Sequence, residues 1–184
     1  MPEHAAELEI LYRQCELNLN APMTHAAGRL FDAVSALLGL APDRITYDGQ
    51  PAIRLEAAAG RPGAIGDPMW RSREENGELV IDWKRLFRSD AVIDAGEFHR
   101  QMAAAAGAMA VYGARATGVR TVLCSGGVFQ NRRLLGLLTD ILAREGLEVF
   151  VPGQIPMNDG GIACGQAVWA ACGFQLQNNG YGNE

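Results

Sequence analysis

Apolar residues recur every three or four positions through much of this chain, which is the spacing of one face of an α-helix. The clearest run covers residues 97–117, and a second covers residues 131–145. Gly118 and Gly146 follow these runs directly, and glycine commonly ends a helix because it adopts a left-handed conformation without strain. Strands are expected at 121–124 and 147–151, and a last helix at 159–172. This alternation predicts an α/β fold with parallel strands joined by right-handed crossovers.

The first half of the chain predicts further helices and a small hairpin. Helices are expected over residues 3–19, 28–38 and 51–59, with Thr24 as the cap of the second. Residues 45–47 fit a short strand or an extended piece. The dipeptide Asn76-Gly77 divides the segment 69–83, and Asn-Gly is a strong signal for a hairpin turn. We therefore expect a short mixed or parallel sheet flanked by helices, with a small hairpin around 69–83.

Composition and charge narrow the class of protein. With 184 residues, 48% of them apolar, the chain can bury one core, and we expect a single lobe over residues 1–174 with a flexible tail at 175–184. The net charge of −5 has no basic stripe, which argues against direct binding to nucleic acid. No segment approaches the ~20 apolar residues of a membrane span. The first residues lack a signal-peptide pattern, and the four cysteines form no CxxC pair, so we expect a cytoplasmic protein with reduced, partly buried thiols.

Two glycine-rich segments follow the expected strands. The first, 124–131, contains Ser125, Gly126 and Gly127 and leads into a helix at Asn131. Consecutive backbone N–H groups in such a turn, together with the helix N-terminus, form a site for anionic oxygens, and ligands of open α/β sheets bind beyond the carboxyl ends of strands. The alternative is a tight turn with no ligand. No Gly-Lys-Ser/Thr sequence follows, so this is not a Walker loop.

The second segment, 156–165, places Asp159 before the last helix. Its carboxylate fits two roles: a helix N-cap, or a ligand for a metal ion at the strand end. A third segment contains Gly28 and Arg29, followed later in the chain by Gly49. Arg29 lies three residues before Asp32 on the expected helix, so an ion pair between them is the simplest interpretation.

A hydrolase is a further possibility that the sequence disfavours. Ser125 or Cys124 would be the nucleophile, and His25 or His99 the base. No nucleophile elbow is present, and neither histidine is close to an expected strand end. We expect His99 to be a surface or half-buried residue of the long helix.

Four segments occur in an order that resembles the C-terminal part of HypF, the carbamoyltransferase family of nickel–iron hydrogenase maturation. They are THAAGRLFDAVSALLGL, ITYDGQPAIRLE, LCSGGVFQNRRLL and PMNDGGIACGQAVWA, and the resemblance spans roughly Asn20 to Ala171. It implies one lobe of a domain of the sugar kinase/Hsp70/actin type, related to the enzymes that make threonylcarbamoyl-adenosine in transfer RNA. Such a domain receives carbamoyl-adenylate and passes the carbamoyl group to the C-terminal cysteine of HypE.

The resemblance also assigns roles to residues. It implies ATP or carbamoyl-adenylate as the ligand, and a divalent metal ion held by one aspartate and an HxxxH histidine pair. The matching aspartate is Asp159. The positions that match the family's nucleotide-binding segments are Ser125, Gly126, Gly127, Asn131, Gly28, Arg29 and Gly49.

Two departures from the family pattern limit what we expect of this chain. The HxxxH pair is absent, since His4, His25 and His99 do not have that spacing. Thr24 is followed by His25 and Ala26, where the family usually has Thr-Ser-Ser. We therefore expect a transferase-related lobe that is inactive as an isolated chain and that pairs with a complementary first lobe or with itself. The alternative is a non-catalytic nucleotide-binding or assembly module with this fold.

Overall fold

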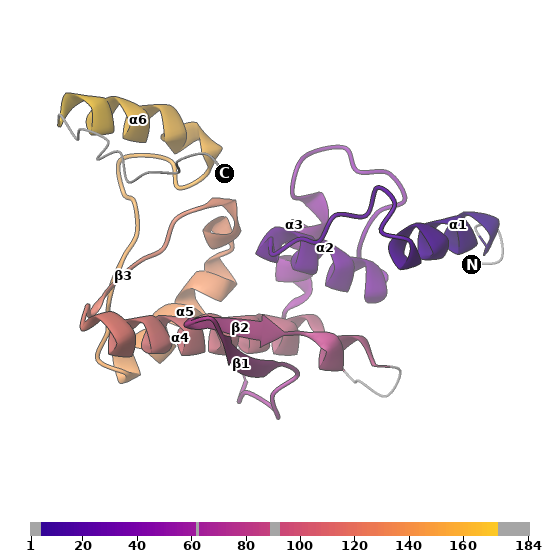
Figure 1. The fold of residues 1–184 in the computed structure, drawn as a ribbon, viewed down its shortest axis with the longest axis horizontal. Coiled ribbons are helices and arrows are strands. Elements are labelled where there is room, and N and C mark those ends of the chain that lie inside the picture. Colours follow the sequence, from indigo (N-terminus) through magenta and orange to yellow (C-terminus); the bar gives the residue numbers. More distant parts are fainter. Residues whose placement is uncertain (1–4, 62, 89–92, 173–184) are drawn as a thin grey trace, which may run out of the picture.

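The computed structural model describes residues 5–61, 63–88 and 93–172. Its helices and strands are α1 (Ala5–Glu16), α2 (Ala27–Leu37), α3 (Gln50–Ala58), β1 (Arg71–Glu75), β2 (Glu78–Asp82), α4 (Ala95–Thr117), β3 (Thr121–Leu123), α5 (Arg132–Arg144), β4 (Glu148–Phe150) and α6 (Ile162–Ala171). Three short 3₁₀ helices are η2 (Lys84–Phe87), η3 (Gly127–Gln130) and η4 (Asp159–Gly161). In Figure 1 the long helix α4 runs beside α5, α2 and α3 lie above it, and α1 and α6 lie at the periphery.

The core forms where α2 and α3 meet α4. Phe98 of α4 is fully buried, and its ring meets that of Phe31 edge-on, with 4.9 Å between the centroids. The hydroxyl of Ser35 is also buried and donates a hydrogen bond to the carbonyl of Pro51 at 2.9 Å, which ties α2 to α3. Leu55 completes this part of the core with no exposed surface. Burial of these apolar side chains is the main stabilising contribution here.

Helix α5 packs on the other side of α4. Its leucines at positions 134, 138 and 142 recur every four residues and are all buried. The close approach of the two helices requires a glycine, since a Cβ at Gly107 would lie 2.7 Å from the Cγ2 atom of Ile141. The predicted helices 97–117 and 131–145 are thus confirmed, with Gly118 and Gly146 both at positive φ directly after or near their ends.

Both predicted strand pairs are present. Strands β1 and β2 form the expected antiparallel hairpin, and Asn76 and Gly77 have φ of 53° and 80° at its turn, as a two-residue hairpin loop requires. Strands β3 and β4 are parallel, with Val122 opposite Val149, and α5 connects them. The architecture is mixed α/β with two small sheets.

In the first half, one local prediction is wrong, and for another the structure excludes one of two alternatives. Thr24 is not the cap of α2, which begins at Ala27; its hydroxyl instead accepts a hydrogen bond from the Ala26 N–H at 3.1 Å. Of the two alternatives for residues 45–47, the strand is not formed: the Thr46 N–H donates its hydrogen bond to Oε1 of the buried Gln50 side chain at 2.9 Å. A side-chain acceptor has replaced a strand partner.

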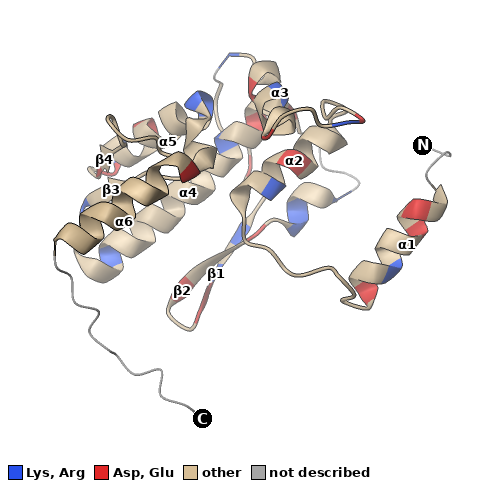
Figure 2. Cartoon of the chain, turned by 90° about the horizontal axis from the view of Figure 1, so that it is seen from above, with Lys and Arg blue, Asp and Glu red and all other residues tan. Residues whose placement is uncertain are grey.

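The two terminal helices bury none of their residues. Helix α1 exposes the apolar stripe that predicted it, including Leu8, Leu11 and Tyr12. Helix α6 carries no charged residue and is tan throughout in Figure 2. Cys124 is buried, but Cys15, Cys164 and Cys172 are exposed, so the expectation of partly buried thiols is wrong for the three cysteines in or beside these helices. The four are unpaired thiols.

The tail predicted at 175–184 and His4 lie outside the described residues. Among the helices that the structure describes, none has the length and apolar character needed to cross a membrane.

Candidate functional site

The two glycine-rich turns lie side by side beyond the carboxyl ends of β3 and β4. The N–H of Gly126 donates a hydrogen bond to the carbonyl of Met157 at 2.6 Å, and the hydroxyl of Ser125 approaches the same oxygen at 3.5 Å. The N–H of Cys124 donates to the carbonyl of Phe150 at 2.9 Å, which extends the pairing of the two strands. Segments that are some thirty residues apart in the sequence therefore meet at one edge of the sheet, where α/β proteins bind ligands.

The backbone of the first turn faces open space. Gly126 has φ 105° and ψ 157°, a conformation that only glycine adopts readily. A Cβ at Gly126 or at Gly127 would meet no heavy atom within 4 Å. Ser125, Gly126 and Gly127 are exposed. A ligand oxygen can therefore approach this backbone closely, without a side chain in the way.

The second turn uses its glycines differently. A Cβ at Gly161 would collide with the carbonyl oxygen of Pro156, so glycine is required there for packing. The cap at this position is Asn158, whose Oδ1 accepts a hydrogen bond from the Gly160 N–H at 3.1 Å. Asp159 is the exposed first residue of η4, and α6 begins only at Ile162. The interpretation of Asp159 as the N-cap is wrong, because its neighbour already fills that role.

Asp159 belongs to no three-ligand metal group in the part of the chain that the structure describes. Within residues 5–61, 63–88 and 93–172, no group of three or more His, Cys, Asp or Glu side chains is placed to hold a metal ion. The two described histidines do not help: His25 is exposed beside α2, and His99 lies in the core. The residues present here do not make a metal site on their own.

Asn131 joins the first turn to the core. It caps α5, with its Oδ1 accepting from the Leu134 N–H at 2.8 Å. Its Nδ2 donates to Nε2 of His99 at 2.9 Å, and Nδ1 of His99 donates to the carbonyl of Ala95 at 2.6 Å. Since a carbonyl only accepts, this chain of bonds fixes His99 as the neutral tautomer with its proton on Nδ1. The predicted nucleotide contact of Asn131 stays a prediction; the structure gives its amide an inward, structural role.

His99 is the residue that sequence reasoning missed. It has no exposed surface, which corrects the expectation of a surface or half-buried side chain. The signal was present: Ala95, His99 and Ala103 are spaced by four and all face the core. Burial lowers the pKa of His99, a further decrease comes from Arg133, and the bond to Ala95 and the charge of Glu56 oppose it. A wide apolar face can include a histidine whose two nitrogens both have partners.

These contacts also weigh against a hydrolase. Both ring nitrogens of His99 are occupied by Ala95 and Asn131, so neither is available to take a proton from Ser125. Burial raises the pKa of the Cys124 thiol, which disfavours the thiolate that a nucleophile needs.

Of the other predicted residues, Gly28 lies near the first turn. A Cβ at Gly28 would be 3.7 Å from Cγ2 of Val128, so the start of α2 packs beside η3. Arg29 is exposed, and its expected ion pair with Asp32 is not among those formed by the described residues. Gly49 precedes α3 with φ 72°, and a Cβ there would meet nothing within 4 Å, so its requirement for glycine is conformational.

Comparison with known proteins agrees with this arrangement. Residues 1–166 match the family described as "Carbamoyltransferase, Kae1-like Domain, second subdomain". The carbamoyltransferase HypF of Rhodobacter capsulatus is 37% identical over 176 residues, which is 95% of this chain and 23% of that protein. A more distant relative is the tRNA N6-adenosine threonylcarbamoyltransferase of Tropheryma whipplei, 27% identical over 197 residues, which cover 97% of this chain and 46% of that protein.

The fold has a close match among solved structures. The crystal structure of full-length HypF in its phosphate- and nucleotide-bound form superimposes with a TM-score of 0.80 and 32% identity, over 90% of this chain and 23% of that one. The chain thus spans about a quarter of the length of the HypF proteins it matches. Sequence and fold agree over nearly the whole chain, and it belongs to the HypF carbamoyltransferase family, in which it corresponds to the second subdomain of the Kae1-like domain.

Proposed function

We propose that this chain binds the phosphate of ATP or of carbamoyl-adenylate at its two glycine turns, as one lobe of a carbamoyltransferase. The acceptor would be the C-terminal cysteine of a HypE-like protein. In that transfer the acceptor thiolate forms a C–S bond with the carbamoyl carbon, and the bond from that carbon to the adenylate oxygen breaks, so that AMP leaves. The role of this chain would be to hold the phosphate of the leaving AMP.

The hydrogen bond from Gly126 to Met157 is the observation that supports this proposal most. It holds two exposed glycine turns beyond adjacent strand ends, with the backbone of Gly126 and Gly127 open to an approaching ligand. Backbone N–H groups in such turns bind anionic oxygens without needing a lysine or an arginine. The N-terminus of α5, directly after the first turn, adds a favourable partial positive charge.

The proposal leaves part of the site to another chain or segment. Asp159 would supply one carboxylate ligand to a divalent ion, and the remaining ligands would come from a complementary first lobe. Exposed apolar side chains at the strand edge and on α6, including Leu123 and Val168, would be covered by that lobe or by a second copy of this chain. Light scattering after size-exclusion chromatography, with and without a first lobe, tests this pairing.

A second candidate function is a non-catalytic nucleotide-binding or assembly module. The absence of a three-ligand metal group among the described residues favours it. The carbamoyltransferase lobe and a nucleotide-binding module both require nucleotide binding at the same turns, whereas an assembly module does not. The two candidates differ in whether addition of a first lobe and carbamoyl-adenylate produces carbamoyl transfer to an acceptor cysteine.

Calorimetric titration with ATP tests nucleotide binding at the two glycine turns. The Gly126→Ala change forces a side chain into a conformation with φ 105°, so we expect nucleotide affinity to fall at least tenfold. Gly153→Ala is the matched control: it adds the same methyl group to the neighbouring turn, at a position with no positive φ and no atom within 4 Å of the new Cβ. If the unmodified chain gives no heat with ATP at protein concentrations near a millimolar, the nucleotide site is refuted for this chain.

A further inference from the structure

A pair of buried side chains connects the first glycine turn to the core. Asn131 directly follows η3, its N–H donates to the carbonyl of Val128 at 3.1 Å, and the residue is only 8% exposed. His99 of α4 has no exposed surface, and its Nε2 accepts a hydrogen bond from Nδ2 of Asn131 at 2.9 Å. The two residues are 32 positions apart in the sequence. Their contact therefore fixes the segment that leads out of the turn against a helix of the core.

The amide of Asn131 has a different partner at each end. Its Oδ1 accepts a hydrogen bond from the Leu134 N–H at 2.8 Å, while its Nδ2 donates to His99. If the amide turned over, its NH2 group would face the Leu134 N–H, and two donors would meet. Nε2 of His99 can accept because Nδ1 carries the proton and donates to the carbonyl of Ala95. Neutral His99 thus selects one orientation of the amide, and that orientation caps α5 directly after the turn.

The glycine turn depends on anchors outside itself. A Cβ at Gly126 or Gly127 would meet no heavy atom within 4 Å, and glycine has more backbone freedom than any other residue. The carbonyl of Met157 holds the Gly126 N–H before the turn, and Asn131 fixes the chain after it. Groups that are held in place before a ligand arrives lose less entropy when it binds. The orientation of Asn131 therefore affects how well the turn can bind a phosphate.

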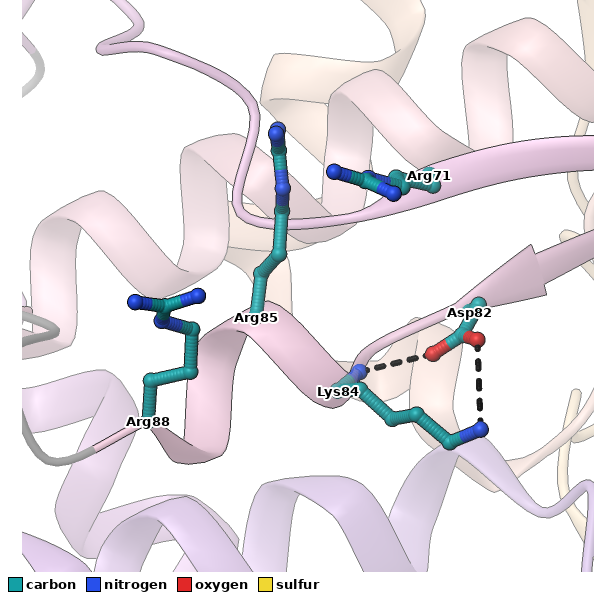
Figure 3. Close-up of a pocket in the computed structure, with 5 residues that line it drawn as sticks. All are labelled: Arg71, Asp82, Lys84, Arg85 and Arg88. Carbon is teal, nitrogen blue, oxygen red and sulfur yellow. Dashed lines mark hydrogen bonds and ion pairs between the residues drawn. The ribbon is translucent and has the colours of Figure 1, made fainter.

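The polar cluster at the base of the β1–β2 hairpin is local by comparison (Figure 3). Oδ1 of Asp82 accepts a hydrogen bond from the Lys84 N–H at 2.8 Å, and Nζ of Lys84 lies 3.8 Å from Oδ2. The Lys84 side chain is 91% exposed, and an ion pair in water contributes little to stability. The buried pair of His99 and Asn131 instead joins α4 to the end of the glycine turn, so it can influence the site.

We propose that His99 is a positioning residue for the phosphate-binding turn. As a neutral imidazole it holds the amide of Asn131, and through that amide it holds η3 and the backbone of Gly126 and Gly127 in the conformation that binds phosphate. The inference rests on the nucleotide site proposed above and adds a condition to it. Protonation of Nε2 would place an N–H group against the NH2 group of Asn131, and a buried donor would lose its partner. ATP affinity should therefore fall when His99 is protonated.

The groups around His99 set the pH at which this loss occurs. Burial lowers the pKa of His99 below 6.5, the bond to Ala95 and the charge of Glu56 of α3 raise it, and Arg133 of α5 lowers it. Helix α2 presents the uncharged ring of Phe31, which lies edge-on to the imidazole with 5.3 Å between the centroids. The two facing charges oppose each other, and burial is the largest effect. The loss of affinity is therefore expected below pH 6.5.

The experiment measures the ATP affinity of the full chain and of three variants by calorimetry. His99→Leu removes the acceptor of Asn131, whereas His99→Gln provides an amide oxygen as acceptor and does not titrate. Gln101→Leu is the matched control, because Gln101 is also a fully buried polar residue of α4 and it bonds to the loop 66–69 rather than to the turn. Circular dichroism confirms that each variant is folded at the pH of the titration.

At pH 8 we expect His99→Leu to weaken ATP binding about tenfold, Gln101→Leu less than about twofold and His99→Gln about threefold or less. When the pH is lowered from 8 to 5.5, the affinity of the unmodified chain should fall relative to that of His99→Gln by about threefold or more. This ratio cancels the titration of ATP itself, since its terminal phosphate takes up a proton in the same range. A purely structural role of His99 would not change the ratio with pH.

Backbone amide exchange tests the positioning without a ligand. The N–H groups of Gly126, Phe129 and Asn131 each donate a hydrogen bond within or beside the turn. In His99→Leu these three N–H groups should exchange about tenfold faster than in Gln101→Leu, after correction for the global stability of each variant.

The outcomes separate this inference from the nucleotide site on which it rests. Equal losses of ATP affinity in His99→Leu and Gln101→Leu would overturn the positioning role and leave the nucleotide site standing. An affinity ratio that stays constant or rises as the pH falls would do the same, as would equal exchange rates in the two leucine variants. The absence of ATP binding to the unmodified chain would overturn both proposals.

Discussion

Helices α5 and α6 follow the two parallel strands in the same way, yet they are stabilised differently. Helix α5 carries apolar residues on one face and charged residues on the other, and its buried leucines pack on α4. Helix α6 is apolar on all sides, has no charged residue, and buries none of its side chains. Ile162, Val168 and Trp169 are each more than half exposed.

The comparison teaches that an apolar sequence is not enough to place a helix in a core. A helix that is apolar all round is normally enclosed by other elements, and the HypF relative from Rhodobacter capsulatus is about four times longer than this chain. Helix α5 finds its partner within the described residues, and α6 does not. Three changes, from the largest expected effect to the smallest, test this difference.

The first change compares one leucine with one valine. Leu138→Ala in α5 removes a side chain that is 2% exposed, and a cavity in this packed contact with α4 should lower the free energy of unfolding by about 2–5 kcal/mol. Val168→Ala in α6, at 54% exposed, should change it by less than about 0.5 kcal/mol. Urea denaturation followed by circular dichroism measures both.

An equally large loss for Val168→Ala would contradict the comparison. It would mean that α6 is covered in solution. Repeating the measurement over a range of protein concentrations then tells whether a second copy covers it, since self-association makes stability depend on concentration.

The second change concerns the hydrogen bond between His99 of α4 and Asn131, the cap of α5, and is measured as the pH dependence of stability. Burial lowers the pKa of His99 below its ordinary value of 6.5, so the unfolded chain binds this proton more readily than the folded one. The contribution of neutral His99 to stability is complete above about pH 6.5 and is lost as the pH falls below that value, at up to ~1.4 kcal/mol per pH unit. The facing charges, Glu56 of α3 and Arg133 of α5, act in opposite directions on this proton.

Unfolding free energies between pH 5 and pH 8 measure this slope. His99→Gln removes the titrating group and should flatten the curve by the same amount. Asn131→Asp keeps an oxygen as the cap of α5 and puts a carboxylate oxygen against Nε2 of His99, so it should raise the pKa of folded His99 and reduce or reverse the loss of stability below pH 6.5. Identical slopes for the unmodified chain and His99→Gln would show that His99 does not titrate on unfolding.

The third change concerns the start of α6. Asn158→Ala removes the side chain that accepts the Gly160 N–H, and the loss of such a cap costs about 1 kcal/mol or less for this short turn. Asp159→Ala removes an exposed carboxylate that caps nothing and should be nearly neutral. Thermal denaturation of the two variants side by side measures the difference, and a larger loss for Asp159→Ala would restore Asp159 as the cap.

Much of the fold could be predicted from local sequence. The helices α4 and α5, the hairpin turn at Asn76-Gly77 and the parallel pair β3–β4 all follow from periodicity and turn residues, and all are confirmed. The two glycine turns were expected at strand ends, and the hydrogen bond between Gly126 and Met157 places them together. Local sequence did not indicate which side chain accepts a given backbone N–H: Gln50 accepts from Thr46, and Asn158, in place of Asp159, accepts from Gly160.

The sequence by itself determined the elements, their order and the glycine positions of the two turns, because these depend on the spacing of side chains and on backbone conformations within a few residues. Only the tertiary structure decided that His99 is a neutral core residue bonded to Asn131, that Asp82 contacts both Lys84 and Arg73, and that α5 packs in the core while α6 buries none of its side chains. The physical reason is that burial and charge balance depend on which distant segments pack together, and the spacing of residues within one segment does not determine those partners.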